Sequence, residues 1–223
     1  MALLGALAGT AFLYTLYRHR QDSRVRAARR AAFLDEAKEL FTGGVKVITP
    51  DGFPRISGQY EGRTFDIQAV PDTLNYRKLP TLWVLVSLAE PMPVRGTLDI
   101  MMRPRGVEYF SRHAALPVQM APDPALPHDC TVRTDAPEAL PPRDILLKHA
   151  RILDDPLAKE LVISPKGLRI VWLAEEAHRA RYLIFRDSEM GLVPFSAATL
   201  KPLLDHLLAL SEDLTAAMPE TAP

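Results

Sequence analysis

The segment RISGQYEGRTFDIQAV, residues 55–70, decides the fold class of this chain. Apolar and polar residues alternate over residues 65–69, which is typical of a strand with one buried and one solvated face. Glu61-Gly62 interrupts the pattern in the way that a two-residue hairpin turn does. The sequence therefore predicts two antiparallel strands, at 55–60 and 63–70.

Two further strands are predicted after this hairpin. Residues 82–88, LWVLVSL, are apolar at nearly every position, which indicates a central strand covered on both faces or a strand at an interface. Residues 97–103 alternate again, with Leu98, Ile100 and Met102 expected to point inward. The first half of the soluble region is thus expected to be antiparallel β structure.

The second half combines a helix with more strands. An apolar stripe over 145–153 predicts a helix, and residues 157–160 and 175–180 are expected to form turns. Strands are predicted at 161–164, 168–174 and 181–186.

Residues 196–217 predict a long amphipathic helix with Ser196 as its N-cap. Its buried stripe is expected to consist of Leu200, Leu203, Leu204, Leu207, Leu208, Leu210 and Leu214. Strands are grouped rather than alternating one by one with helices, so the predicted fold class is α+β. We expect an antiparallel sheet, or two small sheets, covered by this helix and by the end of an N-terminal helix.

The middle of the chain is rich in proline. Residues 117–142 hold seven prolines, which predicts an irregular connection between two halves with a short strand at 130–133. The hairpins around Gly62 and Gly167 share a turn-and-strand pattern. The two halves are therefore either a duplicated ββ(β)α unit or two unrelated hairpins.

The first 17 residues, MALLGALAGTAFLYTLY, carry no charge. This length is at the lower limit for a membrane-spanning helix, which is about 17 residues. Bulky Tyr14, Tyr17 and Arg18 stand where a signal peptide would be cleaved, so an uncleaved signal anchor is predicted for residues 1–17.

Six arginines follow the apolar run and are the predicted membrane-surface residues: Arg18, Arg20, Arg24, Arg26, Arg29 and Arg30. By the positive-inside rule they place the N-terminus outside a bacterial inner membrane and the single-pass protein's C-terminal domain in the cytoplasm. They either set this topology alone or also contact lipid headgroups.

Residues 18–44 are expected to be a basic juxtamembrane helix. Strong helix formers dominate this stretch, which predicts that the helix runs to Leu40 or Phe41 and ends at Gly43-Gly44. Its far end carries an apolar face of Phe33, Leu34, Ala37, Leu40 and Phe41, which should dock on the α+β domain of residues 45–215. Residues 216–223 are expected to be a tail.

Composition argues against a nucleic-acid partner and against an intramolecular disulfide. Residues 1–50 hold eight Lys or Arg and four Asp or Glu, whereas residues 51–223 hold 19 and 23. A slightly acidic domain is a poor nucleic-acid binder, so no nucleic-acid partner is expected. Cys130 is the only cysteine, so no intramolecular disulfide can form, which fits a reducing compartment.

No motif for nucleotide, cofactor or metal binding is present, and no cofactor, metal site or catalytic residue is assigned. Cys130 is interpreted as a small buried hydrophobe. The alternative is a nucleophile paired with His113 or His128.

Two polar loops, 72–80 and 103–110, are the candidate binding regions because arginine and tyrosine are enriched at interface hot spots. Their candidate residues are Asp72, Tyr76, Arg77, Lys78, Arg103, Arg105 and Glu108. The alternative is that both loops are solvated and pair arginine with glutamate locally.

These features favour a membrane-anchored protein whose cytoplasmic domain acts as an interaction or assembly module. Its expected partners are the membrane and another membrane or membrane-associated protein. A membrane-tethered enzyme with a pocket near Asp72, Arg77, Arg103 and Glu108 is the first alternative. A domain that binds lipid headgroups or a small ligand is the second.

Overall fold

The computed structural model describes residues 2–73, 79–104, 108–177, 179, 182 and 190–218, with side chains described from Phe12 onward. The elements are α1 (Ala2–Ala31), α2 (Asp35–Lys38), β1 (Thr42–Ile48), β2 (Pro54–Tyr60), β3 (Arg63–Asp72), β4 (Thr81–Leu88), β5 (Leu98–Met102), η1 (His113–Ala115), β6 (Val118–Met120), β7 (Cys130–Thr134), η2 (Pro137–Ala139), α3 (Arg143–Ala150), η3 (Arg151–Asp154), β8 (Ala158–Ser164), β9 (Gly167–Glu176) and α5 (Ala197–Ala217).

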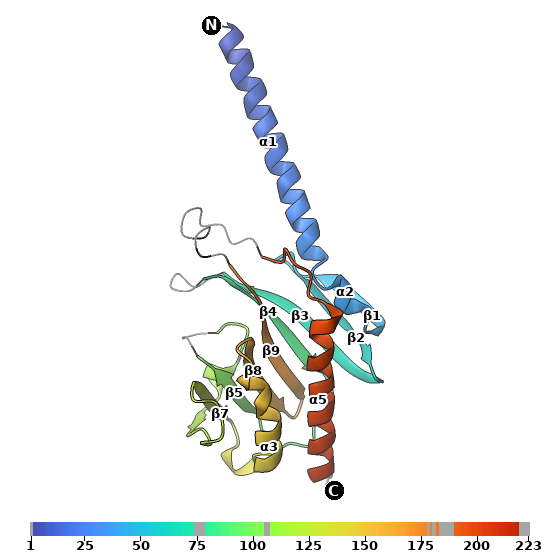
Figure 1. Cartoon of the computed structure of the whole chain (residues 1–223), viewed down its shortest axis with the longest axis vertical. Helices are drawn as coiled ribbons and strands as arrows, with labels where there is room; N and C mark the ends of the chain where they lie inside the picture. The colour runs from blue at the N-terminus through green and yellow to red at the C-terminus, as the bar shows by residue number, and fades with distance from the viewer. Residues whose placement is uncertain are drawn as a thin grey trace.

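One antiparallel sheet holds all the strands of the described residues, in the order β1-β2-β3-β4-β9-β8-β5-β7-β6 (Figure 1). The α+β class is confirmed, with one large sheet rather than two small ones. The apolar run of residues 82–88 forms β4, which lies between β3 and β9 near the middle of the sheet. β4 is therefore a central strand, as predicted.

The β2–β3 hairpin follows the sequence closely. Glu61 and Gly62 have φ angles of 48° and 75°, which is the left-handed turn that a two-residue hairpin favours. The inward residues of β3 are buried, with Phe65, Ile67 and Ala69 at 0% exposure. The predicted two-residue hairpin and its buried face are confirmed.

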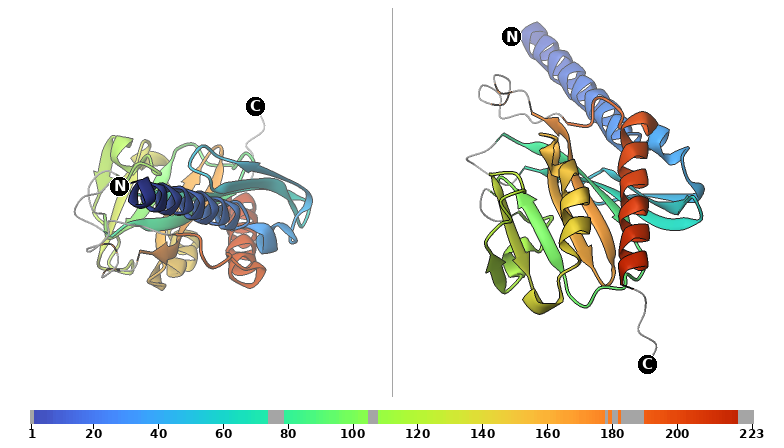
Figure 2. Two further views of the ribbon diagram at one scale, coloured as in Figure 1. Left: turned by 90° about the horizontal axis from the view of Figure 1, so that it is seen from above. Right: turned by 60° about the horizontal axis from the view of Figure 1, so that its bottom comes forward.

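Helices α3 and α5 lie side by side on one face of the sheet (Figure 2). The Ser196 Oγ accepts a hydrogen bond from the Thr199 N–H, so Ser196 caps α5 as predicted. The leucines of the predicted stripe are buried against the sheet, except Leu208, which is half-buried. This face carries the main hydrophobic core.

The helix prediction for residues 18–41 is wrong in its end point. α1 ends at Ala31, a turn follows, and Gly43 and Gly44 lie within β1. Phe33 and Leu34 are adjacent and are both almost fully buried. No glycine or proline lies between residues 18 and 41 to stop the helix, so packing of this region in the core, rather than a local signal, sets its end. The predicted docking of this region is nevertheless confirmed.

Two stretches predicted as turns belong to strands instead. Residues 158–160 begin β8, and Glu175 and Glu176 end β9 opposite Leu82 and Thr81. Their charged residues are typical of a turn, but their main chain continues the hydrogen bonding of the sheet. The predicted strand at 181–186 falls almost entirely outside the described residues.

The proline-rich stretch is mostly irregular, as predicted, but it contributes the last two strands at one end of the sheet, of which β6 is the edge strand. β7 confirms the strand predicted at 130–133, and β6 pairs with it at the sheet edge. Cys130 on β7 is buried, and burial raises the pKa of its thiol. The prediction of a small buried side chain is confirmed at this position.

Among the described residues, the second face of the sheet is covered by the segment around residues 108–116, which includes the short 3-10 helix η1. Phe110 packs there against Val70, Leu85 and Val171, with the Trp83 ring 5.3 Å from the Phe110 ring. Polar and charged side chains surround this small apolar cluster, so this face carries the candidate site.

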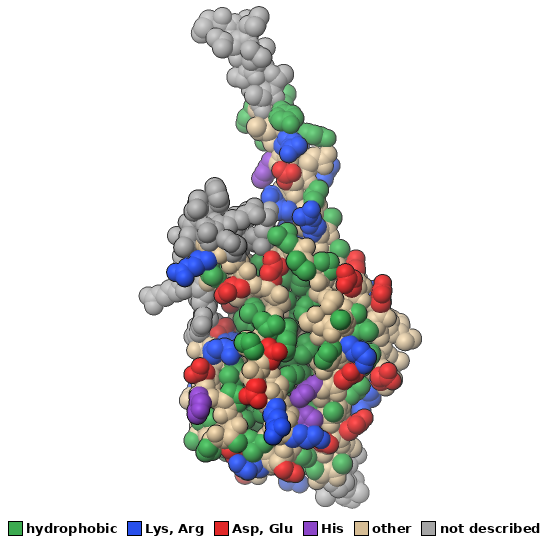
Figure 3. All heavy atoms as spheres, viewed as in Figure 1, with side chains coloured by type: hydrophobic (Ala, Val, Ile, Leu, Met, Phe, Trp, Pro, Cys, Tyr) green, Lys and Arg blue, Asp and Glu red, His purple; other side chains and the backbone are tan. Residues whose placement is uncertain are grey.

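α1 stands clear of the domain (Figure 3). Among the described residues, no helix combines the length and the apolar character needed to cross a membrane. Of the predicted anchor, residues 1–17, the side chains up to residue 11 lie outside the described part of the chain.

Candidate functional site

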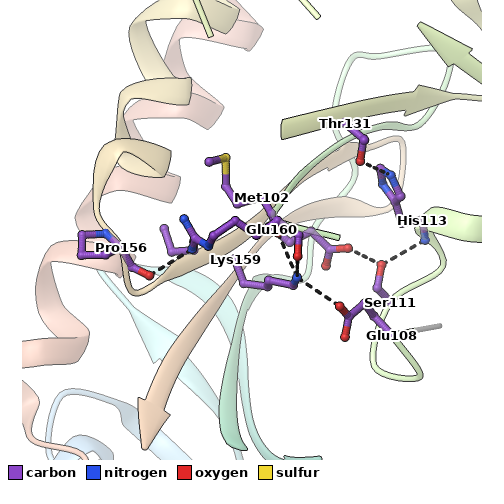
Figure 4. Close-up of polar contacts among 10 residues, drawn as sticks. Met102, Glu108, Ser111, His113, Thr131, Pro156, Lys159 and Glu160 are labelled. Atoms are coloured by element: carbon purple, nitrogen blue, oxygen red, sulfur yellow. Dashed lines mark hydrogen bonds and ion pairs between the residues drawn. The ribbon is translucent and has the colours of Figure 1, made fainter. Parts of the chain in front are cut away.

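A β-bulge in β8 builds the site. Ala158 pairs with Trp172 and Glu160 pairs with Val171, so Lys159 is an extra residue on one strand. A bulge breaks the alternation of side chains along a strand and can redirect a side chain toward a site. Here the side chains of both Lys159 and Glu160 reach the segment that carries Glu108 and Ser111 (Figure 4).

Lys159 fastens this segment to the sheet. Its Nζ lies 3.1 Å from the Glu108 Oε1 and donates to the carbonyl oxygens of Met102 and Arg103, both at 2.9 Å. The Lys159 and Glu108 side chains are 5% and 4% exposed. Such a buried ion pair persists only when further hydrogen bonds satisfy its charges, and the two carbonyls supply them.

Arg103 holds the start of the same segment in a strained conformation. Its φ is 45°, although the residue before a proline prefers extended backbone. The Arg103 Nη2 donates to the carbonyl oxygens of Pro156 at 3.0 Å and Ala158 at 2.9 Å. Strain of this kind persists only where surrounding contacts enforce it and is concentrated at functional sites.

A hollow of about 130 Å³ opens between the sheet and this segment. It is lined by Asp72, Leu79, Thr81, Trp83, Arg103, Glu108, Pro156, Lys159, Leu173 and Glu176. Three predicted residues from two loops, Asp72, Arg103 and Glu108, therefore meet at one recess. The other loop candidates, Tyr76, Arg77, Lys78 and Arg105, lie outside the described residues.

The tyrosine beside the recess ties the covering segment to β3. The Tyr109 hydroxyl donates a hydrogen bond to the Pro71 carbonyl oxygen. Burial, followed by the negative charges of Asp72 and Asp51, raises the pKa of Tyr109 well above its ordinary value. Tyr109 therefore stays a neutral donor.

A second polar cluster lies beyond Lys159, on the same face. Asp99 from β5, Glu160 from β8 and His113 from η1 each offer a ligand atom, and these atoms lie within 4.8 Å of one another. All three residues are buried, at 2%, 0% and 7% exposure. One imidazole and two carboxylates form a donor set that could hold a metal ion.

Hydroxyl groups position two members of this cluster (Figure 4). The His113 Nε2 is 2.9 Å from the Thr131 Oγ1, and the Ser111 Oγ donates to the Glu160 Oε1. Burial, followed by the negative charge of Asp99, raises the pKa of Glu160 well above its ordinary value. The alternative that paired His113 with Cys130 is wrong, because successive residues of β7 point to opposite faces and His113 meets Thr131.

Sequence reasoning did not find Asp99, Lys159 or Glu160, and it did not place His113 correctly. A signal was present, because Asp99 stands alone in the otherwise apolar LDIMM of β5 and Glu160 stands beside Lys159 in the mainly apolar AKELVIS of β8. A charge within a strand that is buried on both faces indicates a paired or functional group.

The predicted membrane-surface arginines divide into two groups. Arg18, Arg20, Arg24 and Arg29 are exposed along α1. Arg26 and Arg30 are half-buried, and the Arg30 side chain reaches Gly52 and Gly191 of the domain. Arg30 thus packs where α1 meets the domain and also adds to the positive charge of α1.

No family model matches the chain, and none of the curated proteins is similar to it. Among solved structures, it is similar to the crystal structure of the mycobacterial trehalose monomycolate transport factor A, TtfA. The TM-score is 0.40 and the sequence identity 10%, over 90% of this chain and 99% of that chain. Because the resemblance is so distant, the site is interpreted from its own residues.

Proposed function

We propose that residues 1–17 anchor the chain in a bilayer and that the α+β domain acts beside the membrane surface as an interaction module. The observation that carries this proposal is the uncovered apolar surface of α1. Phe12, Leu13 and Tyr14 are 62–65% exposed on a helix that stands clear of the domain. Exposed apolar surface of this kind marks a membrane or protein contact.

The base of α1 supports the proposal because it is joined firmly to the domain. Phe33 packs against Phe53 and Phe195, with ring centroids 6.1 Å apart in both pairs. The Phe195 N–H donates to the Phe33 carbonyl oxygen at 2.8 Å. A helix held in this way would keep the domain at a constant distance from the bilayer.

The arginines would set the orientation. At 1.5 Å per residue, Arg18 and Arg30 are separated by about 18 Å along α1. An upright helix would therefore place Arg18 and Arg20 at the headgroups and Arg30 at the domain. The proposed topology has the N-terminus outside and the domain in the cytoplasm of a bacterial inner membrane.

The recess is the proposed binding site for a partner protein. Its lining includes three carboxylates, from Asp72, Glu108 and Glu176, against two cations. Lys159 pairs with Glu108 and with main-chain carbonyls, and Arg103 binds main-chain carbonyls, so the lining keeps one formal negative charge in excess. The Trp83 ring adds a surface suited to a cation. We therefore expect a basic side chain of a membrane-associated partner to enter this hollow.

Membrane anchoring is tested by fractionating cells that express the full-length chain. The variant Leu13→Lys should move the protein from the membrane to the soluble fraction, because it places a charge in the apolar run. Val25→Lys is the matched control, since Val25 is also exposed on α1 but lies beyond the run. Equal membrane retention of both variants would contradict the anchor.

Partner binding is tested by crosslinking in cells and purification in mild detergent. Glu176→Arg should abolish capture of a stoichiometric partner, because it reverses an exposed charge at the recess. Glu212→Arg, an exposed site on α5, should leave capture unchanged. Recovery of the wild-type protein alone would reject the interaction module.

A membrane-tethered enzyme or ligand-binding domain is the second candidate. It is favoured by the convergence of Asp72, Arg103 and Glu108 on a concave surface. A metabolite screen by thermal shift would test it, with Glu176→Arg expected to remove any hit. A screen without hits, together with a captured partner, would favour the first proposal.

A further inference from the structure

We propose that Asp99, His113 and Glu160 form a binding site for a divalent transition-metal ion of the Zn²⁺ or Mn²⁺ type. The site is separate from the recess and does not depend on the proposed partner. It unites three elements that are distant in sequence, β5, η1 and β8.

The first argument is the state of the three ligand atoms. Asp99 Oδ1, His113 Nδ1 and Glu160 Oε2 are buried, and none makes a hydrogen bond of acceptable geometry among the described residues, although Asp99 Oδ1 and His113 Nδ1 lie 2.9 Å apart and would form an ion pair with the imidazole protonated. Buried polar atoms are nearly always satisfied, so three unsatisfied atoms in one place need a common explanation. They lie within 4.8 Å of one another, and a single cation between them would satisfy all three.

The second argument is the geometry of the Asp99–His113 pair. The Asp99 Oδ1 and the His113 Nδ1 are 2.9 Å apart, yet they do not form a hydrogen bond. Ligand atoms about 2.05 Å from a tetrahedral zinc ion are about 3.3 Å apart, and an octahedral ion with ligands at right angles brings them to about 2.9 Å. The observed separation fits two ligands of one octahedral ion, and it is also the length of an ordinary hydrogen bond.

The third argument is the orientation of the imidazole. Thr131 Oγ1 lies 2.9 Å from the His113 Nε2 and can accept its proton. In that tautomer Nδ1 presents its lone pair to the two carboxylates, an arrangement that is repulsive without a cation. Metal-binding histidines commonly donate their other N–H to a nearby oxygen, which sets the ring orientation.

A hydroxyl group also orients the Glu160 carboxylate. Ser111 donates to its Oε1, which leaves Oε2 directed toward Asp99 and His113. The neighbouring cation, Arg169, donates its Nε to the Ser87 Oγ at 3.0 Å. Two buried carboxylates so close together are costly unless a positive charge is shared between them.

The donor set indicates the class of ion. Imidazole favours Zn²⁺ and its neighbours, whereas carboxylates also suit Mn²⁺. Three protein ligands leave at least one coordination position for water or another ligand, as in catalytic rather than structural zinc sites. The alternative occupant is a proton held between the two carboxyl groups, and the experiment distinguishes the two.

The test uses full-length protein in mild detergent after removal of metals with a chelator. Zn²⁺ and Mn²⁺ are titrated separately by isothermal calorimetry. We expect one ion per chain with a dissociation constant in the micromolar range or below for at least one metal. Glu160→Gln and Asp99→Asn should each weaken binding at least about 100-fold. Glu138→Gln and Asp129→Asn, on exposed side chains, are the matched controls and should bind as the wild type does.

A spectroscopic measurement on the wild type tests the proposal even where the variants fail to fold. X-ray absorption of the metal-loaded wild type should show a first shell of nitrogen and oxygen donors that includes one imidazole. Absence of binding at 1 mM of either ion, or equal affinity in wild type and Glu160→Gln, would overturn the proposal in favour of a shared proton. Partner capture is expected to persist in Glu160→Gln, so failure of this site is distinguishable from failure of the interaction module.

Discussion

The two faces of the sheet are built in opposite ways. The face under α3 and α5 is covered by an apolar core in which Leu200, Leu204 and Leu207 are fully buried. The other face is covered by an irregular segment and buries Asp99, Glu160 and the Lys159–Glu108 pair. Apolar burial on the first face is favourable throughout, whereas each buried charge on the second needs a partner.

This difference separates stability from function. Burial of charge is costly, and buried charged groups are concentrated at functional sites, which supports the proposal that this face serves recognition or chemistry. The bulge in β8 and the strained backbone at Arg103 occur on the same face. In this proposal, apolar packing on the helix-covered face offsets the cost of burying charges on the loop-covered face. Four substitutions test this comparison.

The largest effect is expected from Lys159→Met on the loop-covered face. It leaves the buried Glu108 carboxylate without its ammonium partner, so we expect a loss of about 3–5 kcal/mol in the free energy of unfolding. Urea denaturation of the full chain in detergent measures it. The double variant Lys159→Met/Glu108→Gln should recover part of the loss, and a single-variant cost below about 1 kcal/mol would show that the pair is unimportant.

Leu204→Ala tests the helix-covered face. Leu204 is fully buried in α5, so the truncation should cost about 2–5 kcal/mol through lost burial and a new cavity. The matched control is Leu208→Ala, half-buried on the same helix, which should cost clearly less. Metal binding and partner capture should persist in folded Leu204→Ala protein. Equal costs for the two leucines would contradict the described orientation of α5.

His206 makes the helix-covered face sensitive to acid. Burial, followed by the positive charge of nearby His149, lowers the pKa of His206 from 6.5 to about 4. Between these pH values the unfolded chain binds a proton that the folded chain does not, so stability falls as the pH drops through this window. Allowing for partial exposure, the loss is about 2 kcal/mol.

The check is the free energy of unfolding at pH 7 and pH 4.5. The ring of His149 lies 5.0 Å from the ring of His206. The Asp213 carboxylate lies 2.7 Å from the His149 Nε2 and 2.5 Å from the Lys148 Nζ. His206→Gln should reduce the acid-induced loss, whereas His128→Gln, on an exposed residue, should not. An unchanged loss in His206→Gln would assign the acid sensitivity to other groups.

The smallest effect is expected at the start of α5. Ser196→Ala removes the cap on the Thr199 N–H and should cost about 1 kcal/mol. Ser196→Gly should cost only a few tenths of about 1 kcal/mol in the free energy of unfolding, because glycine is tolerated at the N-cap position. Thermal denaturation of the two variants side by side measures the difference, and the reverse ranking would exclude a capping role.

The sequence alone predicted those elements in which local pattern and tertiary role agree. The hairpin at Glu61-Gly62, the central strand of residues 82–88 and the Ser196-capped helix follow from turn chemistry, hydrophobic period and capping. Part of the recess was also predictable, because Asp72, Arg103 and Glu108 lie in polar segments at the ends of strands.

The tertiary structure alone decided where local signals conflict with long-range packing. α1 ends at Ala31 although no glycine or proline follows before Thr42, and Phe33 then packs against Phe53 and Phe195, which are distant in sequence. The cluster of Asp99, His113 and Glu160 arises because β5 pairs with β8 and residues 108–116 lie over both strands. Contacts between residues 14 to 61 positions apart depend on strand order and a bulge, and no local period in the sequence encodes either.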